Sequence, residues 1–380
     1  MVENSSPLSG LTEAALRRRS AEVLHAAERA PDATGVLQAA NAALALYVPS
    51  SAGAWSVVDP GTLLPSWPMH IANAPYQDST AYWEREFLVD GSMLFRDLAG
   101  RTVPVGRLFH ETSGLLARSA RYREFMAPRG YTDDLRAVLR VAGTSWGFVE
   151  LLRGAGEKPF TAQEAAFVAE LVEPLARILR TKIIQSTSQL RAASDTPGLL
   201  VFDSAGVLTS FNESAGAWLQ ELPNGVGEPD HLPDAISAVL GFARAVAAGG
   251  QRGPARLRVR ARSGHWIVLD ASCLSTADGI VSATAVVIER AVPAEVAPVI
   301  VSAYDLSARE QEITRLLTQG ASTAGIAATL HLSVYTVRDY IKDIFAKVEV
   351  SSRGELVARL FHEHYQRPLV EAAMQSARQD

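Results

Sequence analysis

The chain has very little cysteine. A single residue of this type, Cys273, stands among 380 residues, so no disulfide can form within the chain, and a lone thiol suits a reducing compartment. Cys273 lies in an alternating apolar and polar stretch typical of a strand, which indicates a small buried side chain; a redox role is the alternative. The sequence also lacks any run of eighteen apolar residues and any basic segment followed by an apolar core at its start. We therefore expect a cytoplasmic protein with no membrane partner.

Motifs of the common enzyme classes are missing as well. There is no GxSxG, HExxH, P-loop, CxxC pair or dinucleotide-binding fingerprint. No strand ends in an acidic pair followed by the aspartate and lysine of a phosphoacceptor domain. We expect no catalytic residue, no metal site and no activation by aspartyl phosphorylation. The net charge of −5 argues against nonspecific binding to polyanions by the chain as a whole.

The richest local pattern lies near the C-terminus, where residues 305–361 contain four helix starts. Ser-x-x-Glu pairs at 307–310 and 352–355 have the spacing of a reciprocal capping box. Ser322 and Ser333 are suitable N-caps for the two helices between them. These four starts predict four short helices.

The connections between these helices are short. Gly320 follows the first helix and tolerates the positive φ that often ends one. Only two residues lie between Leu330, the end of the second helix, and Ser333, the cap of the third. This spacing predicts a helix-turn-helix over 323–342, with the third helix placed to enter the major groove of DNA.

The third helix has two faces at about 100° per residue. The apolar face is expected to pack on the other helices and contains Val337, Ile341, Ile344, Phe345 and Val348. The opposite face is polar and contains Tyr335, Arg338, Asp339 and Lys342. A polar face is ordinarily just solvated, but the short turn and the caps favour a DNA-reading surface here.

These residues resemble the LuxR-type (NarL/FixJ/GerE) DNA-binding domain. The resemblance rests on five motifs: LSARE at 306–310, GAS at 320–322, IAATL at 326–330, LSVYTV at 332–337 and SSRGELVA at 351–358. It implies an all-α four-helix domain over 304–366, followed by a tail over 367–380. Such a domain binds double-stranded promoter DNA as a homodimer, and RNA polymerase is a further candidate partner.

The resemblance also implies roles for individual residues. Base contacts are expected from Arg338, Asp339, Lys342 and Tyr335. Contacts to the DNA backbone are expected from Thr323, Thr336, Tyr340, Lys347 and Arg353. Val357 and Leu360 are expected at the dimer interface on DNA. The chemistry suits base readout, since Arg or Lys donates to guanine O6 and N7 and Asp accepts from cytosine N4.

The chain departs from the family pattern at several positions. Tyr340 stands where the family usually has His, Glu349 replaces a Gly, and Ala324 with Gly325 replaces a polar pair. Residues 302–366 contain seven Lys and Arg but eight Asp and Glu, a net charge of −1. Because nucleic-acid binders usually have a basic footprint, we expect weak binding by a monomer and specific binding only by a dimer.

Residues 1–190 have the pattern of an α+β domain with a long C-terminal helix. Expected helices lie at 12–28, at 34–46 and from 162 to about 189, with a strand at 54–58 and a hairpin of strands at 135–141 and 146–152. The segments RYREF at 121–125, LRAVLR at 135–140, WGFVELLR at 146–153 and FTAQE at 160–164 resemble a GAF domain of the kind that precedes LuxR-type domains in actinobacterial regulators. The long helix is either a dimer spine or packs only on its own domain.

Residues 191–292 resemble a PAS domain. Two strands (198–203 and 207–211) are followed by two helices (212–219 and 233–248) and three strands (255–262, 266–274 and 280–289). Arginines alternate along the first of those three strands at 256, 258, 260 and 262, giving a basic face that is solvated, faces a partner or binds an anion. Pro293 and Pro298 mark residues 293–303 as the linker to the DNA-binding domain.

The GAF and PAS resemblances imply a small-molecule effector, but the cofactor stays unknown. Trp55, Trp67, Trp83 and Trp146 are candidate pocket residues, the alternative being that they fill the core. His70 and His110 are interpreted as structural groups rather than haem ligands.

The leading hypothesis is a multidomain one-component transcription factor, with α+β GAF-like and PAS-like sensor domains followed by the all-α DNA reader. The alternative is a ligand-responsive interaction module whose helix-turn-helix no longer binds operator DNA. Its negative charge and altered contact positions favour that alternative.

Overall fold

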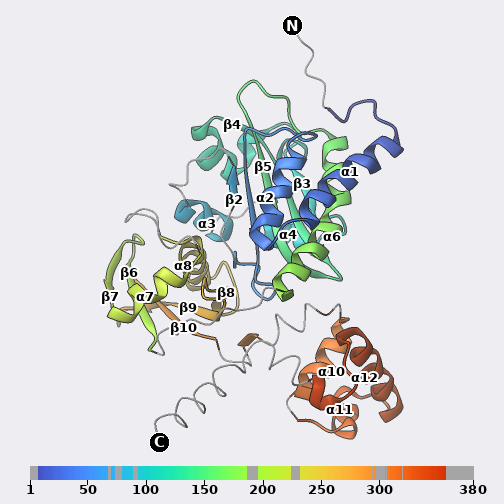
Figure 1. The fold of residues 1–380 in the computed structure, drawn as a ribbon. Helices are drawn as coiled ribbons and strands as arrows, with labels where there is room; N and C mark the ends of the chain where they lie inside the picture. The colour runs from blue at the N-terminus through green and yellow to red at the C-terminus, as the bar shows by residue number, and fades with distance from the viewer. Residues whose placement is uncertain are drawn as a thin grey trace, which may run out of the picture. The chain divides into compact units, whose positions relative to one another are not determined.

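The computed structural model describes residues 7–66, 70–72, 79–88, 93–185, 196–223, 232–291, 295–296, 304, 306–318 and 320–356. The chain divides into two compact units, Met1–Arg290 and Ala291–Asp380, called here the N-terminal and C-terminal units. The N-terminal unit contains two β-sheets, each with helices packed against it, whereas the described part of the C-terminal unit is helical (Figure 1). The expected α+β region followed by an all-α region is therefore confirmed.

The first sheet is antiparallel and follows the order β2-β1-β5-β4-β3. Its strands are β1 (Ala52–Val57), β2 (His70–Ala72), β3 (Val105–Arg107), β4 (Tyr131–Val141) and β5 (Thr144–Gly154). Strands β1, β4 and β5 are buried along nearly their whole length because helices cover both faces of this sheet. The β4–β5 hairpin was expected to have a four-residue connection. Only Ala142 and Gly143, with φ of 49° and 80°, form the turn, and the strands continue to Val141 and Thr144.

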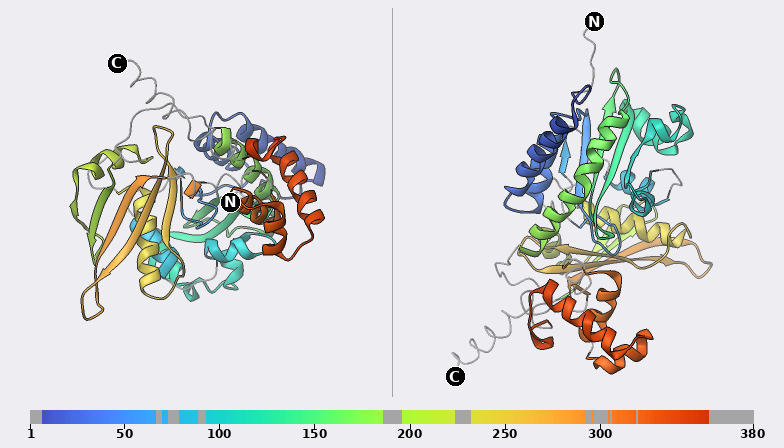
Figure 2. Two further views of the ribbon diagram at one scale, coloured as in Figure 1. Left: turned by 90° about the horizontal axis from the view of Figure 1, so that it is seen from below. Right: turned by 90° about the vertical axis from the view of Figure 1, so that its right-hand side faces the viewer.

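Three helices cover one face of this sheet: α1 (Glu13–Glu28), α2 (Ala33–Leu44) and α6 (Ala162–Gln185) (Figure 2). Each has the expected start. The Thr12 side chain caps α1, and Thr161 and Glu164 form a reciprocal capping box at the start of α6, at 3.1 and 2.8 Å. The apolar stripe of α6 packs inside the unit, while its exposed positions are mostly polar, including the Glu173–Arg177 pair. These contacts favour packing of α6 on its own domain over a dimer spine.

The opposite face is covered by helices that the sequence pattern missed: α3 (Ser79–Leu88) and α4 (Phe95–Gly100), with α5 (Leu108–Glu111) nearby. Phe148 of β5 points to this side, with ring centroids 4.2 Å from Phe95 and 5.8 Å from Trp83. The next residue along the chain toward the turn, Gly147, faces Leu179 of α6 instead. The alternation of a β-strand thus separates the two helical layers.

A cluster of charged residues is buried on the α3 side, which we call the buried ionic cluster: Glu86, Arg121, Asp134, Arg136 and Glu150. Arg136 is fully buried and donates to Glu86 at 2.8 Å and to Glu150 at 3.0 Å. Arg121 pairs with Glu150 and lies 3.2 Å from Asp134. Burying these charges is tolerable because Glu86 and Glu150 balance Arg121 and Arg136, while burial raises the pKa of Asp134 and favours its neutral form.

The second sheet also belongs to the N-terminal unit and follows the order β7-β6-β10-β9-β8. Its elements in chain order are β6 (Gly198–Asp203), β7 (Leu208–Phe211), α7 (Glu213–Glu221), α8 (Asp234–Ala247), β8 (Ala255–Arg260), β9 (Trp266–Ser275) and β10 (Val281–Arg290). The predicted succession of two strands, helices and three strands is confirmed. Counted from its own first strand, each sheet has the same order: second, first, fifth, fourth, third.

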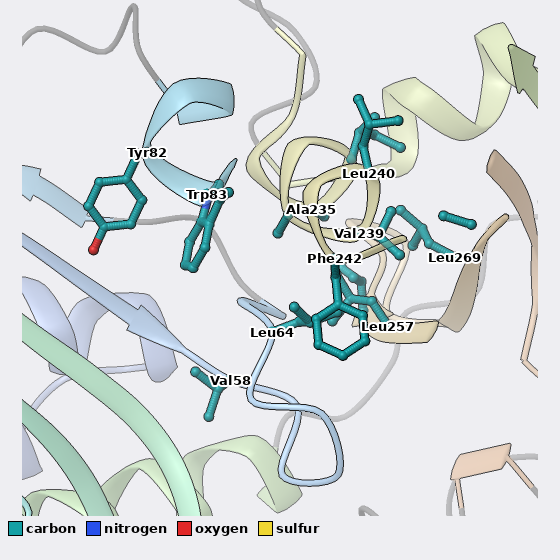
Figure 3. Packing of buried hydrophobic residues seen from close by; sticks show 14 of the residues in the cluster. Val58, Leu64, Tyr82, Trp83, Ala235, Val239, Leu240, Phe242, Leu257 and Leu269 are labelled. Carbon is teal, nitrogen blue, oxygen red and sulfur yellow. The ribbon is translucent and has the colours of Figure 1, made fainter. Parts of the chain in front are cut away.

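The two sheets are joined by specific contacts. Asp59, after β1, is buried and accepts hydrogen bonds at 3.0 Å from the backbone N–H and the Nη1 of Arg258 in β8. Helix α3 packs on α8, with the Phe87 and Phe242 rings 5.4 Å apart. Figure 3 shows Trp83 of α3 on the side of α8 and Tyr82 pointing away from it. The predicted domain boundary at residue 190 lies in 186–195, outside the described residues.

Three arginines of the predicted basic face, at 256, 258 and 260, make contacts within the protein, whereas Arg262 follows β8 and is exposed. Arg256 pairs with Asp270 on β9 at 2.6 Å, and Arg258 pairs with Asp59. Arg260 is buried and donates to the carbonyl of Ile183 at 3.3 Å, and burial lowers its pKa to about 10. These arginines were expected to be solvated, to face a partner or to bind an anion. In the structure they contact other residues of the N-terminal unit.

The C-terminal unit contains α10 (Ala308–Thr318), α11 (Thr323–Leu330) and α12 (Val334–Val348), and residues 353–356 are again helical. Its core is formed by Leu306, Ile313, Leu316, Leu317, Ile326, Leu330, Val337, Ile344, Val348 and Leu356. Among the described residues, no helix is long and apolar enough to span a bilayer, and no group of His, Cys, Asp or Glu could hold a metal ion.

Candidate DNA-binding surface

The starts of α10, α11 and α12 in the C-terminal unit are capped as expected. Ser307 and Glu310 form the reciprocal capping box of α10, at 2.6 and 3.3 Å. Ser322 accepts from the Gly325 amide at 3.1 Å and Ser333 from the Thr336 amide at 3.0 Å. These caps fix the first turns of α11 and α12 and therefore the direction in which α12 leaves the turn.

The start of the fourth helix differs slightly from the expectation. Ser352 accepts from the Glu355 amide at 3.1 Å, but the Glu355 carboxylate accepts from the amide of Ser351 rather than that of Ser352. One of the two hydrogen bonds of the capping box is therefore made to the amide one residue earlier in the chain. The hydrogen bonds from Ser351 hold the pKa of Glu355 below its usual value.

Two helices end at non-glycine residues with positive φ. His331 follows α11 with φ of 54°, and the Leu332 amide donates to the Ala327 carbonyl at 2.9 Å. Glu349 follows α12 with φ of 58°, and the Val350 amide donates to Phe345 at 3.0 Å. Both ends are Schellman motifs, in which glycine is the usual residue. The Glu at 349 therefore keeps the geometry of the family pattern at a conformational cost.

Helix α12 presents the two faces that the sequence predicts. Val337, Ile344 and Val348 are buried, and Ile341 and Phe345 are half-buried. Arg338, Asp339 and Lys342 are exposed on the other side, and Tyr335 retains 75% of its accessible surface. The four predicted base-reading residues therefore lie together on the outward face of one helix.

Most cations of this unit are used internally. Lys347 of α12 donates to Glu310 at 2.7 Å, and Arg309 pairs with Glu312 at 2.7 Å. Within residues 306–318 and 320–356, Arg338 and Lys342 make no hydrogen bond or ion pair, so their charges are available to a partner. The unpaired positive charges of Arg338 and Lys342 thus lie on the exposed face of α12.

Glu310 shows how an internal ion pair is maintained. Its side chain is almost fully buried, and burial alone would raise its pKa. The hydrogen bonds from Lys347 and Ser307 outweigh that effect and hold the pKa below its usual value. Glu310 is therefore ionised at neutral pH and ties α12 to the start of α10.

Arg353 has a structural role that the sequence pattern did not reveal. Its Nη2 donates to the Leu317 carbonyl at 2.6 Å and its Nη1 to the Ala321 carbonyl at 3.0 Å. The Leu317 carbonyl lies in the last turn of α10 and also accepts from the Gly320 amide at 3.1 Å, whereas the Ala321 carbonyl lies in the connection to α11. The short helical turn of residues 353–356 is thereby fixed to the end of α10.

The remaining predicted contacts fall into two groups. Thr323, Thr336 and Tyr340 are half-buried on α11 and α12, and Thr336 Oγ1 lies 2.8 Å from Ser333 Oγ in the turn. Ala324 and Gly325 occupy the first turn of α11, without a polar side chain. Val357 and Leu360 lie outside the described residues, so the predicted dimer contacts stay predictions.

The predicted pocket tryptophans are dispersed in the N-terminal unit. Trp55, Trp83 and Trp146 are each at most 1% exposed, and Trp67 lies outside the described residues. Trp83 lines a cavity of about 260 Å³ between α3, α4 and the loop before β8, whereas Trp55 and Trp146 do not line it. Trp83 is therefore a cavity residue, whereas Trp55 and Trp146 belong to the core.

Comparison with known proteins supports the interpretation of the C-terminal unit. Residues 305–360 match the GerE family, described as "Bacterial regulatory proteins, luxR family". The monoamine regulon transcriptional regulator of Klebsiella aerogenes is 44% identical over 64 residues, which are 17% of this chain and 28% of that protein. The chain thus carries a luxR-family helix-turn-helix domain at its C-terminus, and the match spans about a quarter of that relative's length.

Two solved structures, one of them described as that of a LuxR-type receptor, are also similar to this chain. A Vibrio cholerae VqmA dimer is 19% identical, covering 44% of this chain and 82% of that one, with a TM-score of 0.21. SdiA in complex with octanoyl-rac-glycerol is 14% identical, covering 93% of this chain and 96% of that one, with a TM-score of 0.30. Both TM-scores are below 0.5, so the C-terminal match is the one that supports a function.

Proposed function

We propose that the chain is a one-component transcriptional regulator that binds promoter DNA as a homodimer through α12. The N-terminal unit, with its GAF-like and PAS-like sheets, senses a signal or dimerises and thereby controls when two α12 helices can occupy successive major grooves. One observation carries the proposal: Arg338, Asp339, Lys342 and Tyr335 share the exposed face of α12 within the luxR-family match.

The chemistry of that face suits base readout. Arg338 and Lys342 supply donors for guanine O6 and N7, and Asp339 supplies an acceptor for the cytosine amino group. Because the cations elsewhere on the unit are largely paired, discrimination would come from this face rather than from bulk charge. Thr323, Thr336 and Tyr340 are the proposed backbone contacts, and Lys347 and Arg353 would contribute mainly through the fold they stabilise.

The two-sheet unit supports a sensory role by its construction. The second sheet has the succession of two strands, helices and three strands that the PAS resemblance implies, the first sheet shares its strand order, and the two are joined through α3 and α8. A change at that junction would reach both sheets at once. RNA polymerase and a small-molecule effector are the further proposed partners.

Selection of bound sequences from random duplex DNA with the full-length protein tests the proposal. We expect a two-fold-symmetric motif, and we expect the double variant Arg338→Ala/Lys342→Ala to lose it while the oligomeric state is retained. Arg309→Ala/Arg315→Ala removes the same charge from α10 and should retain the motif. Equal binding of all sequences by wild-type protein, with and without cell extract as a source of effector, would refute the proposal.

The second candidate is a protein-interaction module with a helix-turn-helix that no longer binds operator DNA. The net charge of −1 over residues 302–366 and the lack of polar side chains at Ala324 and Gly325 favour it. It predicts that the Arg338→Ala/Lys342→Ala variant alters a protein contact and leaves binding to every DNA duplex as weak as in wild type.

A further inference from the structure

The cavity beside Trp83 lies at the junction between the two sheets of the N-terminal unit. Its volume is about 260 Å³, and its lining comes from both halves of the unit. The first half contributes the turn at 61–63, α3 and α4, and the second half contributes Phe242 and the loop at 251–254. We refer to it as the junction cavity.

Aromatic rings form the apolar walls of the junction cavity. The Trp83 and Phe87 rings of α3 are stacked with centroids 5.6 Å apart, and Phe242 of α8 meets Phe87 edge-on at 5.4 Å. Phe95 of α4 also lines the cavity. Figure 3 shows Trp83 and Phe242 contributed by separate helices. A flat ring would be packed against faces and edges of this kind.

The indole N–H of Trp83 is buried within the cavity wall. Trp83 is 1% exposed, and its indole Nε1–H makes no hydrogen bond to any described residue. A buried donor of this kind costs free energy unless a ligand or water accepts from it. Because this N–H has almost no accessible surface, the ring of Trp83 rather than its N–H is what lines the cavity.

The charges around the cavity favour an anion. Glu86 is buried, but both its oxygens are engaged, one by the Phe95 amide at 2.6 Å and the other by Arg136 at 2.8 Å. Arg252 is exposed, and Arg96 has only a 3.8 Å contact with Asp97. Two guanidinium groups at the rim are thus little compensated, and guanidinium binds carboxylates bidentately.

We propose that the junction cavity binds a small aromatic carboxylic acid, of one ring or two fused rings, with its ring against the wall formed by Trp83, Phe87 and Phe242 and its carboxylate toward Arg252 and Arg96. The size limit follows from the volume, which lies below the roughly 300 Å³ at which pockets for drug-sized ligands begin. The occupant contacts both halves of the unit.

Binding at this place would favour the docked arrangement of α3 on α8, because only that arrangement completes the cavity. The loop carrying Arg252 is already attached to α3, since Gln251 donates to the Phe87 carbonyl at 3.3 Å. The turn opposite is held by Asp59, which accepts from the Gly61 amide at 2.8 Å. The regulatory meaning of this binding rests on the proposed function, whereas the binding itself does not.

Calorimetric titration of the full-length protein without DNA tests the site. The probes are 2-naphthoate, its neutral amide and 2-naphthylmethylamine, which share one ring system and differ in charge. We expect 2-naphthoate to bind at least tenfold more tightly than the amide and the amine. Because DNA is absent, failure of this test leaves DNA recognition by α12 untouched.

Two variants locate the binding. Arg252→Ala should weaken 2-naphthoate at least tenfold and leave amide binding unchanged, while Arg262→Ala, an exposed arginine on the β8–β9 connection, should change neither. Thr62→Trp, at the half-buried rim, should block all three probes. Absence of 2-naphthoate binding, preference for the amine, or equal effects of the two arginine variants would overturn the proposal. Unchanged far-ultraviolet circular dichroism of each variant verifies the fold.

Discussion

Lys347 on α12 donates a 2.7 Å hydrogen bond to Glu310 at the start of α10. A cation of the helix proposed to read DNA therefore serves the fold of its own unit. Arg353 does the same at the other end of α10, where it donates to two backbone carbonyls. Charged residues that look equivalent in the sequence are thus divided by their contacts into those that hold the unit together and those that remain outward.

Arg353→Ala should destabilise the C-terminal unit by about 1–3 kcal/mol, because the carbonyls of Leu317 in α10 and Ala321 after it lose a charged donor. Lys342→Ala should leave stability unchanged and reduce specific DNA binding. Hydrogen exchange of peptides from 306–356 in the full chain measures the first effect, and DNA titration measures the second. Equal stability of the two variants would contradict the assignment of Arg353.

The ion pair of Glu310 predicts an acid-dependent loss of stability. Its folded pKa is lowered, so its contribution is present above the unfolded pKa of about 4.3 and is lost as pH falls through the folded value. Glu310→Gln should therefore make protection of α10 and α12 against hydrogen exchange less dependent on pH below about 4.5. A steeper acid transition in Glu310→Gln than in wild type would refute this assignment.

Glu349→Gly should stabilise the C-terminal unit by about 1 kcal/mol, since glycine adopts the φ of 58° without a Cβ penalty. It also removes one negative charge, so DNA affinity should rise slightly at low salt. Glu349→Ala is the matched control: it removes the same charge but keeps the Cβ. A gain in stability for alanine equal to that for glycine would show that charge, not backbone conformation, is responsible.

Replacing two carboxylates of the buried ionic cluster by amides should change the free energy of unfolding by different amounts. Burial and the charge of Glu150 raise the pKa of Asp134 to about 8, whereas Arg121 and Arg136, against the effect of burial, lower that of Glu150 to about 2. Asp134→Asn mimics the neutral acid and should cost about 1 kcal/mol or less at pH 7. Glu150→Gln leaves two guanidiniums undercompensated and should cost about 3–5 kcal/mol.

Urea unfolding followed by tryptophan fluorescence measures this difference, since all six tryptophans lie in the N-terminal unit. For Asp134 the folded pKa exceeds the unfolded value of about 3.9, so wild type should lose stability as pH rises from about 4 to 8. Asp134→Asn should lack that loss. Similar costs for the two amide variants at pH 7 would contradict this division of charge.

The local elements were largely predictable from the sequence. Capping residues and apolar periodicity placed α1, α2, α6, α10, α11 and α12 to within a few residues, and both hairpin-rich regions were recognised from their turns. Helices α3 and α4 escaped because their apolar residues, such as Trp83 and Phe95, serve a junction rather than one continuous stripe. Nothing local marks such a junction.

Residues 305–361 by themselves determined the helix-turn-helix, because caps, turn length and helix periodicity act over three to five residues. Only the tertiary structure decided which charges remain available: Arg258 meets Asp59, 199 residues away, and Lys347 meets Glu310, 37 residues away. An ion pair depends on distance in space, which chain spacing does not encode. Packing of α3 on α8 likewise created the junction cavity, from segments that no local pattern connects.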